Sequence, residues 1–583
     1  MKSSESKAKN KKKTSVKKLP SNGKRISFPE GNQSNDDTNL PNAGKKFQDT
    51  TKTIMRRRSR YEKQINAMWE LFSEYSESSS LHGVKYVGQK KRHWIERTWW
   101  AFAFIISLVI CGKLIFDTFT KWERFPVIVT FAEQSTRIWE IPFPAVTLCP
   151  QIKTKQTVFN YTNYFNLYQK DWTKAKGLNA SEFSRLKSAA QVCKTVPKEF
   201  LKIGSLSTTN DIYSNLRRIA PKVSDIMYHC DFNGHKTKDC SKFFKEVWTE
   251  EGLCYTFNFL NGSDLYRTRN LAADYPVTKH NMSAKYWNVN SDYKKVKNVS
   301  EDKIFPHRVF GSSDGLTVSL KILEEDLDYL CGGSVDGFKL LLHPPNEVPQ
   351  MNKYYYRVPM KQEVIFSVKP IFMNTLDTLK SYDSKRRQCY FENERHLTFY
   401  KSYTQRNCEL ECISNYTINK CGCSPFYMPR NSNTSICGLS NYDCYQKCKI
   451  KKVASGQYNL CGCLPSCSSL SYDVEFSLAK FRLQKYFAAK KQSFEGHDVT
   501  RIFISFKDNQ FFASRRSQLY GKTDFLANCG GLLGLFMGFS FLSLVEAVYF
   551  CTLRLACNLR RRHARKKKRL AMMTESFHKE DRF

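Results

Sequence analysis

One apolar stretch near the end of the chain carries residues whose types and spacing could do chemistry. It runs from Asn528 to Ser540 as NCGGLLGLFMGFS, with glycines at 530, 534 and 538. Ser543 adds a second hydroxyl and Glu546 a carboxylate in an otherwise apolar segment. Hydroxyl and carbonyl oxygens can replace part of an ion's hydration shell, and a ring of carboxylates favours cations. The stretch therefore has the groups of a cation path.

Helix packing through small residues is the alternative for the glycines, since GxxxG is common in single-span dimers. It does not account for Ser540, Ser543 or Glu546. An ionisable group inside a membrane is costly and by default marks a water-filled path. We therefore favour a path, formed by several copies of the chain.

Two apolar stretches must position these groups. From Phe525 to Val545 there are 21 residues without a formal charge. The earlier stretch, Thr98 to Gly112, has tryptophans at its borders, where indole rings sit at the headgroup level. A buried core helix or a signal peptide is the alternative there, but about ninety polar residues precede it and no small-residue cleavage site follows. We predict spans over 94–118 and 523–553. Two spans cannot enclose a pore alone, so a symmetric oligomer follows.

Charge predicts the orientation of these spans. The chain carries 93 Lys+Arg against 54 Asp+Glu, a net +39. Residues 1–98 hold 23 Lys/Arg against 10 Asp/Glu, giving +13, and residues 554–583 hold 11 against 3, giving +8. Basic residues mark the cytoplasmic side. We expect cytoplasmic tails over 1–93 and 554–583 and an extracellular domain over 119–522, with membrane lipid and no nucleic acid among the partners; the basic clusters of the first tail favour a solvated segment over a lipid-binding one.

Cysteines and glycosylation signals support an outer location for the central domain. Of 21 Cys, 17 lie between Cys149 and Cys467, as expected for disulfides in an oxidising compartment. The same region contains seven Asn-x-Ser/Thr acceptor sites: Asn160, Asn179, Asn261, Asn281, Asn298, Asn415 and Asn433.

An α+β fold is predicted for this domain. Runs rich in β-branched and aromatic residues indicate strands at 127–131, 143–148, 252–259, 316–323, 473–478 and 501–506. Polar stretches with helical spacing, such as 181–201 and 239–249, lie between them. Residues 1–60 are polar and basic and predict a disordered tail.

Residues 389–467 hold eleven Cys, a density that suits either disulfides or zinc. Thiolate zinc sites belong mainly to reducing compartments, so disulfides are favoured and no metal is expected. Cys408 and Cys412 have a spacing that places both sulfurs on one helix face. The order of the cysteines, with 408, 412, 421 and 423 followed by 461, 463 and 467, suits two antiparallel helices joined in rungs, although spacing alone does not determine the pairs.

Several motifs together resemble the epithelial sodium channel/degenerin superfamily, most closely its insect pickpocket branch. They are His82-Gly83, FPAVTLCP at 143–150, GLCYTFN at 252–258, the 389–467 cysteine array and GGLLGLFMGFSFLSLVE at 530–546. The resemblance covers about 80 to 555 and implies a homo- or heterotrimer with a hand-like α+β extracellular domain of palm, finger and thumb. It also implies a plasma-membrane channel that passes Na+ and, in many members, is blocked by amiloride. No cofactor is implied.

The resemblance also assigns roles by position. Gly538, Phe539 and Ser540 match the selectivity tract, and His82-Gly83 match the cytoplasmic gating motif. The pore and gate positions are Ala527, Asn528, Gly531, Gly534 and Glu546, of which Ala527 is the position where bulky side chains hold family channels open. Gly534 is a position linked to amiloride block.

The same resemblance implies disulfides. They are Cys149–Cys254, Cys230–Cys240, Cys389–Cys467, Cys408–Cys463, Cys412–Cys461, Cys421–Cys444 and Cys423–Cys437. A Cys193–Cys331 bridge is a further expectation. Whether Cys444 or Cys448 pairs with Cys421 stays open.

Other functions compete with a conducting sodium channel. An ATP-gated purinergic receptor shares the topology but lacks the cysteine array and the Gly-x-Ser tract. A non-conducting regulatory or chemosensory subunit and a two-span lipid-binding scavenger receptor remain alternatives. An enzyme is not expected, because no nucleophile–base motif or P-loop occurs. Acidic clusters such as 324–326 are expected to be solvated, so proton gating is not predicted.

Overall fold

The computed structural model describes residues 68–89, 92–124, 126–170, 179–196, 211–289, 293, 300–454, 461–491 and 497–580. The chain forms two compact units: Gly112–Leu532 is one, and the segments up to Cys111 and from Leu533 make the other. The disordered tail expected over 1–60 and the acceptor Asn298 lie outside the described residues.

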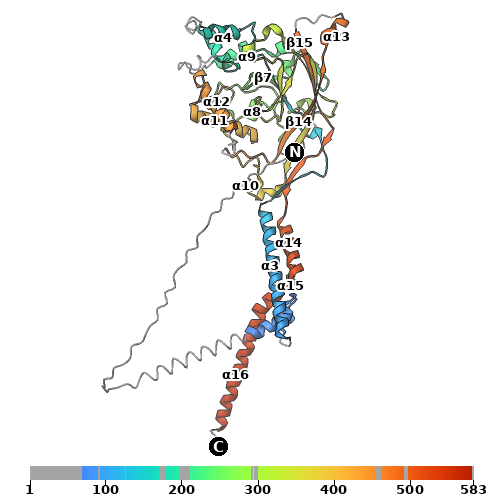
Figure 1. Cartoon of the computed structure of the whole chain (residues 1–583), viewed down its shortest axis with the longest axis vertical. Helices are drawn as coiled ribbons and strands as arrows, with labels where there is room; N and C mark the ends of the chain where they lie inside the picture. The colour runs from blue at the N-terminus through green and yellow to red at the C-terminus, as the bar shows by residue number, and fades with distance from the viewer. Residues whose placement is uncertain are drawn as a thin grey trace, which may run out of the picture. The chain divides into compact units, whose positions relative to one another are not determined.

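An eight-stranded β-sheet is the frame of the unit Gly112–Leu532 (Figure 1). Its order is β1-β17-β11-β15-β8-β4-β5, and β14 pairs with β11 off this path. Within β11, Val364, Phe366 and Val368 are buried and alternate with more exposed residues, as side chains on successive positions of a strand point to opposite faces. The strands are β1 Val127–Phe131, β4 Met227–Phe232, β5 His235–Thr237, β8 Gly315–Leu323, β11 Gln362–Thr375, β14 Ser469–Lys480, β15 His497–Phe506 and β17 Ser514–Gln518.

A second, five-stranded sheet has the order β10-β9-β3-β7-β6. Its three central strands are buried at every residue, and most of their residues are apolar, because a strand covered on both faces has no solvent-exposed side. The strands are β3 Ala145–Pro150, β6 Lys245–Thr249, β7 Gly252–Phe257, β9 Phe338–His343 and β10 Tyr356–Val358. Two short pairs, β2 Thr136–Arg137 with β16 Gln510–Phe511 and β12 Cys423–Ser424 with β13 Ser435–Ile436, complete the strands.

Helices pack around these sheets and confirm the α+β class. α11 (Gln405–Cys421) and α12 (Tyr442–Ala454) lie side by side (Figure 1). α11 begins at Thr404, whose hydroxyl accepts from the Asn407 N–H, and ends at Gly422 with φ +71°, a left-handed cap. The other helices of this unit are α4 Tyr161–Lys170, α5 Ala180–Ala189, α6 Ile212–Ile219, α7 Val223–Ile226, α8 Gly262–Leu265, α9 Tyr329–Gly332, α10 Ser384–Arg387 and α13 Leu483–Ala489.

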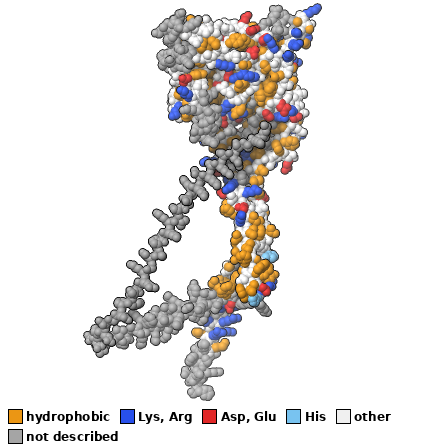
Figure 2. Space-filling view, in the orientation of Figure 1, with side chains coloured by type: hydrophobic (Ala, Val, Ile, Leu, Met, Phe, Trp, Pro, Cys, Tyr) orange, Lys and Arg blue, Asp and Glu red, His pale blue; other side chains and the backbone are white. Residues whose placement is uncertain are grey.

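Long apolar helices come before and after this domain. α3 spans Trp94–Arg124, longer than the expected 94–118. The second apolar stretch is divided into α14 (Lys522–Met537) and α15 (Phe541–Tyr549), after which a π-helical turn at Phe550–Arg554 leads into α16 (Leu555–Glu580). Hydrophobic side chains cover the surface of α3 and α14 in Figure 2. The helical segments Trp94–Arg124 and Phe541–Met572 are long and apolar enough to cross a membrane, and only 6% of each apolar window is buried. This low burial argues against the core-helix alternative.

Three expectations are wrong in detail. Residues 239–249, expected to be helical, form a short 3-10 turn and strand β6, because Val247 and Trp248 pack into the core. A single disulfide, Cys421–Cys444, joins α11 to a second described helix, α12, so there are no successive rungs: Cys408 and Cys412 bind Cys463 and Cys461, which lie outside α12.

The cluster 324–326 is solvated only in part. Glu324 and Glu325 are exposed, but Asp326 is buried, and its carboxylate lies 3.4 Å from the Lys155 ammonium. The Lys155 ammonium compensates the cost of burying the Asp326 carboxylate, so Asp326 is part of the core and not of the solvated surface.

Candidate functional site

One face of α14 carries the predicted gate residues. Ala527, Asn528, Gly531 and Gly534 recur at helical spacing and are all exposed in the single chain. A Cβ added at Gly531 would meet no atom within 4 Å among the described residues. The small residues are therefore not used to pack α14 against its own chain, and this face is open to another copy or to water.

The opposite face of α14 contacts α3. The Phe525 ring stacks on Trp122, with centroids 5.3 Å apart, and the Trp122 indole N–H donates to the Tyr520 carbonyl at 3.1 Å. Further along, the Ser107 hydroxyl donates to the Phe536 carbonyl at 2.8 Å. These contacts fix which side of α14 is turned away from its own chain.

A break in the helix falls on the predicted selectivity tract. Gly538 has φ +65°, and its N–H donates to the Gly534 carbonyl at 2.9 Å, which is the left-handed cap that ends α14. Ser540 then begins α15: its hydroxyl accepts from the Ser543 N–H at 3.2 Å, and the Ser543 hydroxyl accepts from the Ser540 N–H at 3.1 Å. Helix ends leave carbonyl and amide groups without helical partners, so the break supplies backbone oxygens beside a hydroxyl.

His82 and Gly83, the predicted cytoplasmic gating motif, lie against this break. The His82 N–H donates to the Met537 carbonyl at 3.0 Å, which satisfies one carbonyl at the end of α14. A Cβ added at Gly538 would lie 1.8 Å from His82 Nδ1, so only glycine fits there. Gly83 has φ +87° and precedes α2 (Val84–Gly88), where glycine allows the turn. The two motifs, more than 450 residues apart, are neighbours in the fold.

Glu546 contacts a residue that sequence reasoning missed. The Ser80 hydroxyl lies 2.7 Å from the Ser543 hydroxyl and donates to the Glu546 carboxylate at 3.2 Å. The Ser80 N–H lies 3.4 Å from the same carboxylate. Ser80 occurs in a run of serines before His82, and no local signal distinguishes it from its neighbours.

The extracellular end of α3 also contacts the base of the domain. The Arg386 guanidinium of α10 lies over the Trp122 ring, 5.1 Å from its centroid. α10 ends two residues before Cys389, which forms a disulfide with Cys467.

Eight disulfides join sixteen of the described cysteines: seven are the pairs that the resemblance implied, and the eighth is the further expected bridge Cys193–Cys331. The structure places Cys421 with Cys444, while the Cys448 sulfur lies 3.8 Å from that of Cys421. These three sulfurs are close enough to one another for a metal, but two of them form a disulfide and are not thiolate ligands. The pairs are Cys149–Cys254, Cys193–Cys331, Cys230–Cys240, Cys389–Cys467, Cys408–Cys463, Cys412–Cys461, Cys421–Cys444 and Cys423–Cys437.

The predicted glycosylation acceptors fall into two groups. Four are exposed: Asn179, Asn281, Asn415 and Asn433. Asn160 and Asn261 are half-buried and use their side chains in hydrogen bonds, to the Asn163 N–H and to the His280 carbonyl.

A buried charge cluster links the turn between β6 and β7 to β9 and to the segment after β3. The Glu251 carboxylate lies 2.6 Å from both the Lys153 and the Lys339 ammonium groups. Burial would raise the pKa of Glu251, but the two lysines outweigh it and hold that pKa at about 2. This cluster is structural and lies apart from the predicted pore residues in sequence.

Two apolar helices, one disulfide-rich α+β domain between them and a Gly–x–Ser break in the second apolar stretch define a two-span membrane protein of the channel class. The sequence pattern described as "Amiloride-sensitive sodium channel" matches residues 75–550. The chain therefore belongs to the amiloride-sensitive sodium channel family, a family of ion channels and not of enzymes. This confirms the family that the resemblance indicated.

Curated relatives cover most of the chain. Pickpocket protein 28 of Drosophila melanogaster is 28% identical over 522 residues, which are 86% of this chain and 82% of the relative. Sodium channel protein Nach of Drosophila melanogaster is 23% identical over 534 residues, covering 86% and 91%. Acid-sensing ion channel 4-B of Danio rerio is 22% identical over 503 residues, covering 83% and 76%.

Proposed function

We propose that this chain is a subunit of a trimeric, sodium-selective channel whose pore is lined by α14 and α15. The observation that carries the proposal is the exposed face of α14, where Asn528, Gly531 and Gly534 lead to the break at Gly538–Ser540. Three copies around an axis would turn these faces toward one another. The family's name and the sodium channel among the relatives agree with this role.

The selectivity filter in this proposal is Gly538-Phe539-Ser540. Carbonyls at the end of α14 and the Ser540 hydroxyl from each copy would replace part of the hydration shell of Na+. Capping hydrogen bonds within each chain hold these groups in place, so little ordering is needed when an ion enters. Glu546 lies beyond the filter and would add negative charge to the path.

The gate in this proposal lies about three helical turns before the filter, at Ala527 and Asn528. Bulk at Ala527 would hold the helices apart, and Gly534 would contribute to amiloride block. A stimulus to the extracellular domain, chemical, osmotic or mechanical, would reach α14 through Arg386 and Trp122.

Assembly is supported by an apolar strand end that one chain leaves uncovered. Phe476 and Leu478 of β14 are 53% and 51% exposed. Contiguous exposed apolar patches can mark protein–protein interaction sites, and family channels form trimers. In the cell we place the protein in the plasma membrane with both ends in the cytoplasm, as the basic tails predict.

Whole-cell recording from cells that express this chain tests the proposal. A sodium current that amiloride blocks supports it. Silence despite surface expression, also when Ala527 is replaced by Val, contradicts a conducting subunit and favours a regulatory subunit of a heteromeric channel.

A further inference from the structure

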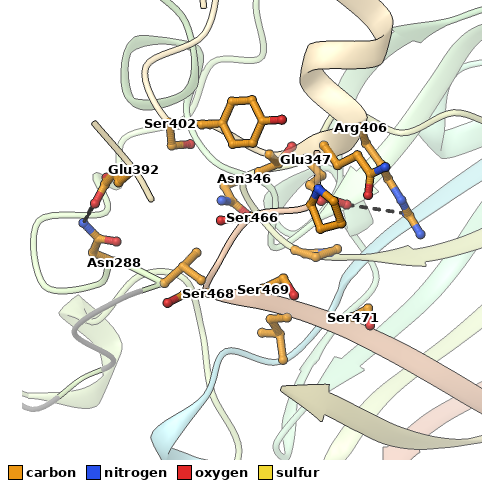
Figure 3. A pocket seen from close by; sticks show the side chains of 17 residues that line it. Asn288, Asn346, Glu347, Glu392, Ser402, Arg406, Ser466, Ser468, Ser469 and Ser471 are labelled. Atoms are coloured by element: carbon orange, nitrogen blue, oxygen red, sulfur yellow. Dashed lines mark hydrogen bonds and ion pairs between the residues drawn. The ribbon is translucent and has the colours of Figure 1, made fainter. Parts of the chain in front are cut away.

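A polar cavity of about 220 Å³ lies in the extracellular domain, where the start of α11 meets the segment before β14 (Figure 3). Four stretches distant in sequence meet there: 288–289, 344–347, 402–406 and 465–471, with Glu392 beside them. Because all of them belong to the unit Gly112–Leu532, the cavity is a feature of one chain.

Asn346 gives this cavity an unused acceptor. The residue is 3% exposed, and its Oδ1 has no hydrogen-bond partner among the described residues. Its backbone is held in place, since the Asn346 carbonyl accepts from Asn407 Nδ2 at 2.9 Å. A buried acceptor without a donor loses the hydrogen bonds it would make to water, which is unfavourable. A ligand that donates a hydrogen bond would remove this cost.

Glu347 places a carboxylate beside Asn346. The Arg406 guanidinium lies 3.5 Å away, on the side where Figure 3 draws the dashed line, and it also stacks over the Tyr354 ring. Burial raises the pKa of Glu347 to about 7, with Arg406 acting against the rise and Glu409 adding to it. Arg406 thus compensates the carboxylate only in part, and a second cation would find a partner here.

Hydroxyl groups make up much of the remaining wall. They come from Ser402, Thr404, Ser466, Ser468, Ser469 and Ser471. Hydroxyls both donate and accept, so they suit a ligand that carries hydroxyls of its own. Since drug-sized sites measure about 300–1,000 Å³, this cavity is too small for a peptide or a steroid.

We propose that this cavity binds a small hydroxylated amine in its protonated form, with the ammonium group between Asn346 Oδ1 and the Glu347 carboxylate. The bound amine would connect α11, which the disulfides hold, to the start of β14. The site goes beyond the proposed channel function. Binding is measured without current, so failure of one does not imply failure of the other.

Ligand-observed NMR on the purified full-length protein, with ethanolamine as the probe at pH 8, tests the site. Glycerol carries hydroxyls but no charge and should bind about tenfold more weakly or worse. Asn346→Leu and Glu347→Gln should each weaken ethanolamine binding by about tenfold or more. Glu363→Gln, which changes a glutamate paired with Arg501 on the sheet, should leave binding unchanged.

A thermal melt separates lost binding from lost folding. Asn346→Leu replaces an unsatisfied buried acceptor with an apolar group of similar shape, so its melting temperature should equal or exceed that of the unchanged chain. Weaker binding with an unchanged or higher melting temperature supports the proposal.

The pH dependence of binding supplies another readout. Glu347 is the group that titrates near neutrality, while His343 stays neutral because burial lowers its pKa to about 3. Arg406, Lys353, Glu409 and Glu392 are the other charged groups that line or flank the cavity among the described residues. Ethanolamine stays protonated between about pH 6 and pH 8, so its binding should strengthen as the pH rises, and Glu347→Gln should abolish that dependence.

Three results would overturn the proposal. They are no saturable ethanolamine binding, equal binding of glycerol, and binding that neither Asn346→Leu nor Glu347→Gln weakens. The first would mean that water alone fills the cavity, the second that charge is not recognised, and the third that the amine binds elsewhere.

Discussion

The backbone N–H of His82 caps the end of α14 by donating to the carbonyl of Met537, the residue before Gly538. The N-terminal motif is thus in direct contact with the predicted filter. A change in the segment before α3 would alter the carbonyls at the break without passing through the extracellular domain.

Gly538→Ala should strongly reduce sodium current at equal surface expression. A left-handed φ costs a residue with a Cβ about 1–2 kcal/mol, and the added Cβ would collide with the His82 ring. Gly112→Ala is the matched control, since a Cβ there meets no described atom within 4 Å, and it should leave the current unchanged. Normal current from Gly538→Ala would show that the break is not needed.

Ala527→Val should produce a standing cation current in resting cells. Ala527 lies on the exposed face of α14, where a larger side chain would prevent close approach of three helices. Whole-cell recording with and without amiloride measures the effect. Leu526→Val, at an adjacent position that is 72% exposed, is the control and should stay closed at rest. An equal current from both variants would contradict a specific gate position.

Ser540→Ala should shift the Na+/K+ permeability ratio toward unity, because it removes a hydroxyl from each copy of the filter. It should also cost about 1 kcal/mol at the start of α15, where that hydroxyl caps the helix. Ser540→Thr keeps the hydroxyl and should retain most of the selectivity. Reversal potentials in sodium and potassium solutions measure the ratio, and an unchanged ratio in a conducting Ser540→Ala channel would refute the filter assignment.

Glu251→Gln should destabilise the protein by about 3–5 kcal/mol, because it leaves Lys153 and Lys339 buried without a counter-charge. The pKa of Glu251 is about 2 in the folded protein and near 4.5 when unfolded. Its ionic contribution of about 3 kcal/mol is therefore present above pH 4.5 and is lost as the pH falls toward 2.

Thermal melts of the detergent-solubilised protein measure this effect. The melting temperature of the unchanged chain should fall steeply between pH 4.5 and pH 2. Glu251→Gln should have a lower melting temperature at neutral pH and lose less of it over the same pH range. Equal stability of the two at neutral pH would contradict the role of the cluster.

Peptide mapping without reduction should find Cys421 bound to Cys444 and Cys408 bound to Cys463. In Cys444→Ser, Cys421 should instead bind Cys448, whose sulfur is 3.8 Å away. A Cys421–Cys448 bond in the unchanged chain would contradict the Cys421–Cys444 pairing in the segment 389–467.

Much of the fold could be predicted because it is encoded in local patterns. Residues 127–131 form a short, mostly apolar run, and in residues 316–323 apolar and polar side chains alternate. The structure has strands β1 and β8 at these places. The helix expected at 239–249 is wrong because the spacing of this stretch fits a helix as well, and only the pairing of its second half with β7 makes that half strand β6. Local spacing cannot distinguish these outcomes when the deciding partner lies elsewhere in the chain.

The candidate site was predictable in its residue types but not in its contacts. Gly538, Ser540 and Glu546 stand out in an apolar segment because polar and flexible residues are unfavourable there without a role. Their roles as filter and pore stay predictions. Ser80 and Asn346 were missed, since a serine in a polar run and an asparagine after prolines carry no local signal.

By itself, the sequence determined two apolar spans, a cysteine-rich domain between them and the glycine–serine pattern of the second stretch. These follow from hydrophobicity, charge and residue type, which act locally. The tertiary structure alone decided that His82 caps α14, that Ser80 meets Glu546 and that four distant segments enclose an unsatisfied Asn346. Such contacts join residues far apart in the chain, and they depend on how the whole core packs.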